Sequence, residues 1–134
     1  MSATIVDPWL EAPPLPLVRH ELGHAFSALE FGAQSVTIHH DEFSWRSTPT
    51  WLSAPTEEAV MASWLGGLVE PEYCSTNDTI VIGAFPAELK SKVLSQLAGV
   101  FDKVRAIDSG KLRDMAIKMS ADGGIQIRKI QASS

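Results

Sequence analysis

The sequence predicts a single small domain of the α+β class. Four stretches carry apolar residues at the spacing of amphipathic helices, at residues 17–31, 56–65, 86–104 and 109–119. Residues 34–40 and 125–130 are instead typical of short strands. The chain of 134 residues is 45% hydrophobic and 20% charged, which is ordinary globular composition. We expect residues 17–134 to form the domain, and the proline-rich residues 1–16 to form an extended arm in front of it.

The first helix, residues 17–31, has clear signals at both ends. Pro16 suits its first turn, and Gly32 is well placed to end it. Gly23 lies in the middle, where glycine costs a helix about 1 kcal/mol relative to alanine. Its presence predicts the close approach of another backbone or of a substrate.

The strand at residues 34–40 leads into a loop or loose hairpin at residues 41–55, with aromatic residues that either line a cleft or cover the core: Phe43, Trp45 and Trp51. The side chains of His39 and His40 point to opposite faces of the strand, so at most one faces the helix. Each is open to interpretation as a metal ligand, a substrate contact or a solvated strand-end residue. We expect the strand to form a sheet edge that pairs with extended peptide.

The second helix is expected to begin after Thr56, a favourable N-cap, with Glu57 and Glu58 in its positive first turn. Gly66 and Gly67 end it, and a polar loop follows at residues 70–79. The remaining expected elements are a long helix from Pro86, a helix capped by Asp108 or Ser109, and a turn at residues 122–124 into the final strand.

Charge and hydropathy exclude several classes of partner. The net charge is −5 and no basic run occurs, so we expect no nucleic-acid binding. No apolar run approaches the roughly 20 residues that cross a bilayer, and we expect neither a membrane span nor a signal peptide. Cys74 is the only cysteine, so no intrachain disulfide forms and the cytoplasm is the expected compartment. Cys74 itself is either a small buried hydrophobe, a metal ligand or a nucleophile.

The run His20-Glu21-Leu22-Gly23-His24 contains the pattern H-E-x-x-H in a predicted helix. Residues four apart lie on one helix face, so His20 and His24 present two imidazoles to one metal ion. Zinc suits neutral imidazole ligands. Glu21 then lies beside the metal-bound water, where a general base belongs. The pattern predicts a zinc site with Glu21 as base.

The third zinc ligand has several candidates. A metzincin would continue with glycine and histidine where Ser27 and Glu30 stand, so that class is excluded. A gluzincin takes a glutamate from a following helix, which would be Glu57 or Glu58. Asp78, in the polar loop before the long helix, is the other candidate.

Three blocks of the chain resemble the protease domain of FtsH-type zinc metalloproteases. In that family the motif helix ends in a Gly-Ala turn before a strand, as in residues 20–38 here, and a buried helix ends in Gly-Gly, as in residues 64–72. Residues 75–78, Ser-Thr-Asn-Asp, are similar to the segment that supplies an aspartate ligand. The resemblance spans about residues 17–105. It implies that His20, His24 and Asp78 bind Zn²⁺ and that Glu21 is the base.

The chain also departs from that family. It has neither the membrane helices nor the ATP-driven ring of its members, and residues 79–82 are more β-like than the helix expected after the aspartate. We therefore expect a stand-alone, small zincin-like domain, in which the motif helix packs between a short sheet and a C-terminal helical cluster.

The expected function is zinc-dependent hydrolysis of peptide bonds in flexible or unfolded protein segments, unless a protein partner delivers other substrates. Two alternatives stay open: an inactive zincin-like binding or assembly module, and a regulatory protease that cleaves one specific partner. Intramembrane zinc proteases share the motif but are excluded by the absence of apolar spans.

Overall fold

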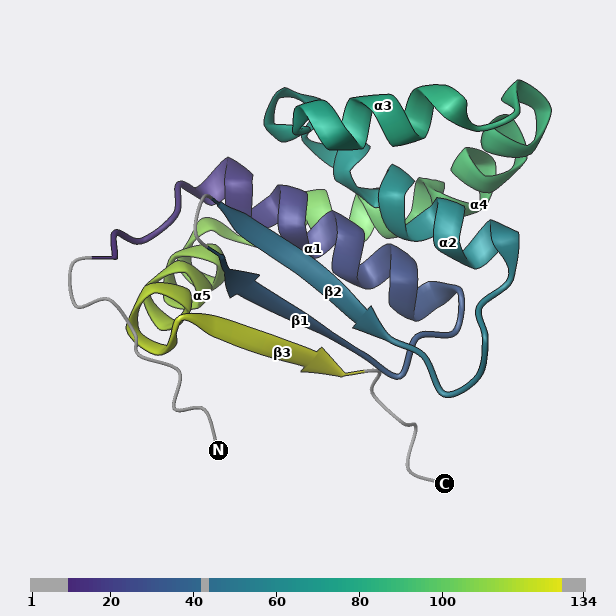
Figure 1. Ribbon diagram of the computed structural model, residues 1–134. Helices are drawn as coiled ribbons and strands as arrows, with labels where there is room; N and C mark the ends of the chain where they lie inside the picture. Colours follow the sequence, from purple (N-terminus) through teal and green to yellow (C-terminus); the bar gives the residue numbers. More distant parts are fainter. Residues whose placement is uncertain (1–9, 42–43, 129–134) are drawn as a thin grey trace.

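The structure, a computed structural model, describes residues 10–41 and 44–128. The chain folds as an α+β domain, as predicted (Figure 1). The described elements are α1 (Leu15–Glu30), β1 (Ser35–His40), β2 (Trp45–Thr50), α2 (Glu57–Leu65), the short 3₁₀ helices η1 (Gly66–Val69) and η2 (Pro71–Tyr73), α3 (Thr76–Ala84), α4 (Ala87–Arg105), α5 (Ser109–Asp122) and β3 (Gly124–Arg128).

The antiparallel sheet has the order β2-β1-β3. In the centre of β1, Ile38 pairs with Ser47 on one side and with Ile125 on the other. Gly123, with φ 73°, turns the chain from α5 into β3 and so delivers the last strand to β1. The expectation that residues 34–40 form a sheet edge was therefore wrong, because both sides of β1 are paired. β2 is the edge strand instead.

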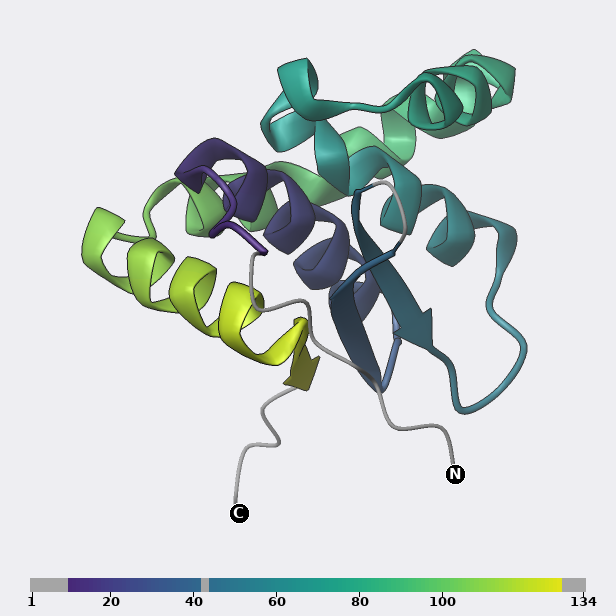
Figure 2. The same ribbon diagram turned by 60° about the vertical axis from the view of Figure 1, so that its left-hand side comes forward.

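Helix α1 lies between the sheet and the helices α2 and α4, with α5 also packed against it (Figures 1 and 2). This arrangement confirms the predicted placement of the motif helix. The largest fully buried side chains come from all of these elements and form one core: Val18, Leu22, Ile38, Met61, Leu65, Val93, Leu97, Leu112 and Met119. None of the helices in the described ranges has the length and apolarity to cross a membrane.

Gly23 occupies the point where α1 meets η1. A Cβ atom built on Gly23 would overlap the carbonyl oxygen of Gly66, and a Cβ on Gly66 would overlap the carbonyl of Gly23. Two backbones therefore touch where neither residue has a side chain. The predicted reason for a glycine inside this helix, the close approach of another backbone, is confirmed.

Most local signals identified the correct element ends. Thr56 caps α2 by accepting a hydrogen bond from the N–H of Ala59, and Asp108 caps α5. Helix α1 begins at Leu15, so the expected arm ends two residues earlier than the predicted residue 16. Its residues 1–9 lie outside the described ranges. The expected loose hairpin contains the regular strand β2, and Phe43 lies outside the described residues.

Residues 76–84 differ from the prediction of a polar loop followed by a β-like run. They form α3, because Ser75 and Asp78 make a capping box at its start. The Ser75 hydroxyl accepts from the N–H of Asp78, and the Asp78 carboxylate accepts from the N–H of Ser75, both at 3.0 Å. This cap fixes the first turn and outweighs the weak strand preference of the β-branched residues that follow.

The contact between Gly23 and Gly66 predicts whether Gly23→Ala stabilises or destabilises the protein. Helix propensity alone would make Gly23→Ala stabilising by about 1 kcal/mol. Because the new methyl group overlaps a fixed backbone, we expect the free energy of unfolding to fall by about 2 kcal/mol or more. Urea unfolding followed by circular dichroism measures the change.

Gly99→Ala is the matched control. Gly99 lies inside α4, and a Cβ there meets no heavy atom within 4 Å. We expect this variant to gain about 0.5–1 kcal/mol. Equal stabilisation by both substitutions would contradict the backbone contact.

Candidate metal centre

His20 and His24 project from one face of α1, and their Nε2 atoms lie 3.1 Å apart. The Nδ1 atom of His20 lies 2.9 Å from the carbonyl oxygen of Gly67, and that of His24 lies 2.6 Å from the carbonyl oxygen of Ser63. A carbonyl oxygen only accepts, so each Nδ1 carries the proton and donates it. In the neutral rings both Nε2 lone pairs therefore face the same point.

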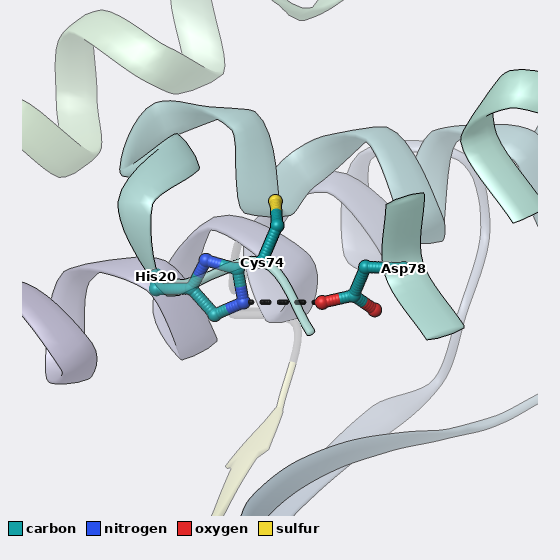
Figure 3. A group of neighbouring side chains, drawn as sticks. All are labelled: His20, Cys74 and Asp78. Carbon is teal, nitrogen blue, oxygen red and sulfur yellow. Dashed lines mark ion pairs between the residues drawn. The ribbon is translucent and has the colours of Figure 1, made fainter. Parts of the chain in front are cut away.

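Asp78 brings a carboxylate to that point from the first turn of α3 (Figure 3). Its Oδ2 atom lies 3.6 Å from Nε2 of His20 and 3.9 Å from Nε2 of His24. The capping box with Ser75 holds the carboxylate in place. The structure thus brings together the three residues that the resemblance predicted as ligands.

The spacing of the three donor atoms fits a zinc ion. Ligand atoms about 2.0–2.1 Å from a tetrahedral ion lie about 3.3 Å from one another. The observed separations of 3.1, 3.6 and 3.9 Å bracket that value. Two lone pairs directed at each other across 3.1 Å also need a cation or a proton between them. Backbone carbonyls that fix the distal ring nitrogens are the usual outer partners of zinc-bound histidine.

Gly67 leaves the space that the two imidazole rings occupy. A Cβ atom on Gly67 would lie 2.5 Å from Nε2 of His24 and 2.7 Å from Cε1 of His20. Its carbonyl oxygen meanwhile accepts from His20. From the sequence, Gly67 was predicted only as a helix end, because a glycine that makes room for a distant side chain has no local signature.

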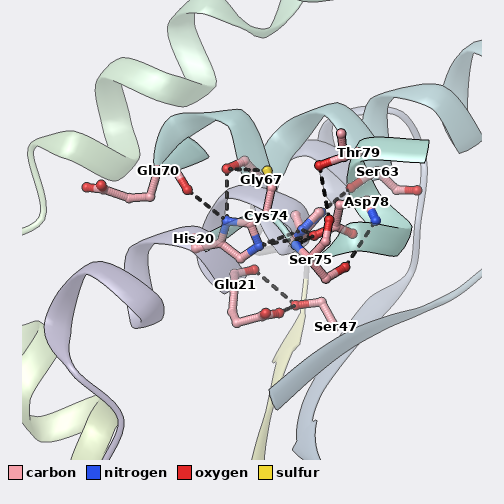
Figure 4. Close-up of polar contacts among 11 residues, drawn as sticks. His20, Glu21, Ser47, Ser63, Gly67, Glu70, Cys74, Ser75, Asp78 and Thr79 are labelled. Atoms are coloured by element: carbon pink, nitrogen blue, oxygen red, sulfur yellow. Dashed lines mark hydrogen bonds and ion pairs between the residues drawn. The ribbon is translucent and has the colours of Figure 1, made fainter. Parts of the chain in front are cut away.

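Glu21 is buried beside the two histidines, and its Oε2 atom accepts a hydrogen bond of 2.6 Å from the hydroxyl of Ser47 on β2 (Figure 4). Burial raises the pKa of Glu21 to about 7, although the Ser47 hydrogen bond and His20 oppose the rise. Nothing in the sequence pointed to Ser47, because its contact with Glu21 joins residues 26 positions apart in the chain.

The ligand candidates have different protonation preferences. Burial lowers the pKa of His24, which favours the neutral ring. Burial acts to raise the pKa of Asp78, but the neighbouring His20 ring and the Ser75 N–H outweigh it, and the pKa lies below its usual value. Burial acts to lower the pKa of His20, but the Asp78 and Glu21 carboxylates outweigh it, so this pKa is raised. Asp78 is therefore the carboxylate that stays ionised.

These groups line a cleft of about 720 Å³ between α1, β2, α2 and the start of α3. Its apolar wall includes Trp51, Val60 and Trp64, so Trp51 lines the cleft, one of the two predicted possibilities. Trp45 also lines it but is 8% exposed and belongs to the core.

The glutamates of α2 and the histidines of β1 that were also predicted as ligand candidates have other surroundings. Glu57 is exposed on α2, and Glu58 forms an ion pair of 3.6 Å with Lys92. The Nε2 atom of His39 lies 3.0 Å from the hydroxyl of Thr48. His40 lines the cleft but packs edge-on against Trp45.

Comparisons with protein-family models, curated proteins and solved structures found no match to this chain. The assignment of a function therefore depends on the geometry of the site and on the motifs.

The site predicts which carboxylate controls metal affinity. Asp78→Asn keeps an amide oxygen that accepts from Ser75 but removes the ionised ligand. We expect its zinc affinity to fall by about 100-fold or more, since loss of even an outer partner costs about 10–100-fold. Competition with a fluorescent zinc chelator measures the affinity.

Glu57→Gln removes one negative charge from the exposed first turn of α2 and is the control. We expect it to bind zinc like the unaltered protein. A larger loss in Glu57→Gln than in Asp78→Asn would place the third ligand on α2.

Proposed function

We propose that this protein is a zinc-dependent metallopeptidase that hydrolyses peptide bonds in flexible or unfolded protein segments. The observation that carries the proposal is the convergence of His20, His24 and Asp78 in the lining of a cleft, with the buried carboxylate of Glu21 beside them. Three protein ligands and an open side are typical of hydrolytic zinc sites.

Each residue has a distinct part in the proposed reaction. His20, His24 and Asp78 would hold the ion, which when bound would polarise the scissile carbonyl and acidify a water molecule. Glu21 takes the proton of the attacking water and passes it to the leaving amine. Ser47 donates to Oε2 of Glu21, and no hydrogen bond to Oε1 is found among residues 10–41 and 44–128, so Oε1 is available to carry that proton. The Nδ1 contacts of both histidines keep their Nε2 atoms directed at the ion.

The cleft favours an extended substrate. β2 lines it, and among the described strands none pairs with the outer side of β2. An edge strand of this kind binds extended peptide by adding it to the sheet. The apolar wall of Trp51, Val60 and Trp64 is suited to large apolar side chains. Flexible or unfolded segments can adopt this extended form, whereas a folded region would be cut only if a partner delivered it unfolded.

The helical conformation of residues 76–84 supports the proposed likeness to FtsH-type proteases. From the sequence, residues 79–82 differed from that family because they looked β-like where a helix is expected after the aspartate. In the structure these residues are part of α3. We also propose that the protein works in the cytoplasm, where a protein with one unpaired cysteine is not oxidised to a disulfide.

Glu21→Gln tests the proposed base. We expect the variant to keep its zinc and to lose about 1,000-fold or more in the rate of cleavage, within the range for general acid–base groups. Cleavage of a fluorescently labelled unfolded protein, with zinc measured on the same sample, provides both results.

Glu30→Gln, at the exposed end of the same helix, is the control and should cut at the normal rate. Normal turnover by Glu21→Gln would remove Glu21 as the base. An unaltered protein that holds zinc but cuts no peptide would favour a binding module.

Ser47→Ala tests the positioning of Glu21. Without the hydroxyl, the carboxylate loses its only side-chain hydrogen bond found in the described residues. We expect kcat to fall about 10-fold while KM and zinc content stay unchanged, since the contact acts through Glu21 and not through substrate. Thr50→Ala, on the same strand but outside the lining of the cleft, should leave kcat unchanged. A fall confined to KM would instead place Ser47 in substrate binding.

A further inference from the structure

Cys74 lies between η2 and α3, one residue before the cap of α3, and is half-buried. Its Sγ atom, a ring nitrogen of His20 and a carboxylate oxygen of Asp78 all lie within 4.8 Å of one another (Figure 3). Two of these residues belong to the proposed zinc site, whereas the proposed reaction has no use for the third. A thiol next to two metal ligands therefore needs an explanation.

The position of this thiol is explained if its sulfur can bind the same metal ion as His20 and Asp78. Thiolate sulfur is among the commonest zinc ligands, at about 2.3 Å from the ion, and four protein ligands make a closed site in which no position is left for substrate. A sulfur and a nitrogen on the same tetrahedral ion lie about 3.6 Å apart. In the structure Sγ lies no more than 4.8 Å from the ligand atoms of His20 and Asp78, so a shift on the order of 1 Å brings it to the distance that a shared ion requires of those two ligands.

The hydrogen bond that Sγ makes in the structure is too weak to hold it in place. The hydrogen-bond partner of Sγ is the carbonyl oxygen of Gly67, at 3.9 Å, which is a long contact even for sulfur. The same oxygen accepts a hydrogen bond of 2.9 Å from Nδ1 of His20. Loss of the Cys74 contact thus leaves Gly67 with its stronger partner.

We propose that Cys74 is a displaceable fourth zinc ligand, which closes the centre formed by His20, His24 and Asp78 into a resting form. This inference rests on the proposed zinc site. On closing, the thiol releases its proton to solvent, a sulfur–metal bond forms, and one water molecule leaves the ion. On opening, water returns and the sulfur regains a proton, so no electron is transferred and no oxidant is needed.

Cobalt(II) tests the proposal, because cobalt bound to thiolate has an intense charge-transfer absorption in the near ultraviolet. The full-length protein is loaded with cobalt(II) alone and compared with Cys74→Ser. We expect both proteins to show the visible bands of four-coordinate cobalt, and the unaltered protein alone to show the thiolate band. Visible bands without a thiolate band in the unaltered protein would overturn the role of Cys74 and leave the metal site intact. Absence of all cobalt bands would overturn the metal site itself.

A second measurement needs no variant. Since Cys74 is the only cysteine, iodoacetamide alkylates this thiol alone. We expect saturating zinc to slow the alkylation by at least about 10-fold, because the sulfur lone pair that attacks iodoacetamide is then bound to the metal. An equal rate with and without zinc, on a sample shown to contain the metal, would contradict ligation by Cys74.

Discussion

The close packing of α1 against η1 determines both the core and the geometry of the proposed metal centre. Gly23 and Gly66 allow the two backbones to touch, and Gly67 leaves room for the rings of His20 and His24. At this short distance the carbonyl oxygens of Gly67 and Glu70 reach Nδ1 of His20. A larger residue at any of these glycines would separate the segments and release the rings. The same packing that builds the core therefore orients the proposed ligands.

Asp78 shows how a local folding signal places a chemical group. Its carboxylate closes the capping box with Ser75 and faces both imidazoles. Glu21 adds a second buried carboxylate to the same small volume. Two acids and two imidazoles out of water are costly unless they are paired or bind a cation. A divalent ion at the point of convergence would satisfy this group, which is why the arrangement favours a metal centre over an ordinary polar core.

Sequence alone predicted the elements with strong local signals and the part of the site that lies on one helix. The spacing of His20 and His24 fixes their common face, and glycines and caps located most helix ends. The conformation of residues 79–82 was mispredicted, because the capping box that precedes them, and not their own composition, makes them helical. The strand order, and with it the edge position of β2 and the contact from Ser47, depends on pairing between distant segments that no local pattern encodes. Asp78 was singled out by resemblance and not by spacing.

In the proposed metal centre, His20, His24 and Asp78 hold one zinc ion. Elemental analysis of the protein, purified without added metal or chelator, tests whether they do. We expect close to one zinc per chain, as in other sites with three protein ligands. Protein that contains no zinc, and that retains none after incubation with zinc and removal of the excess, would contradict it.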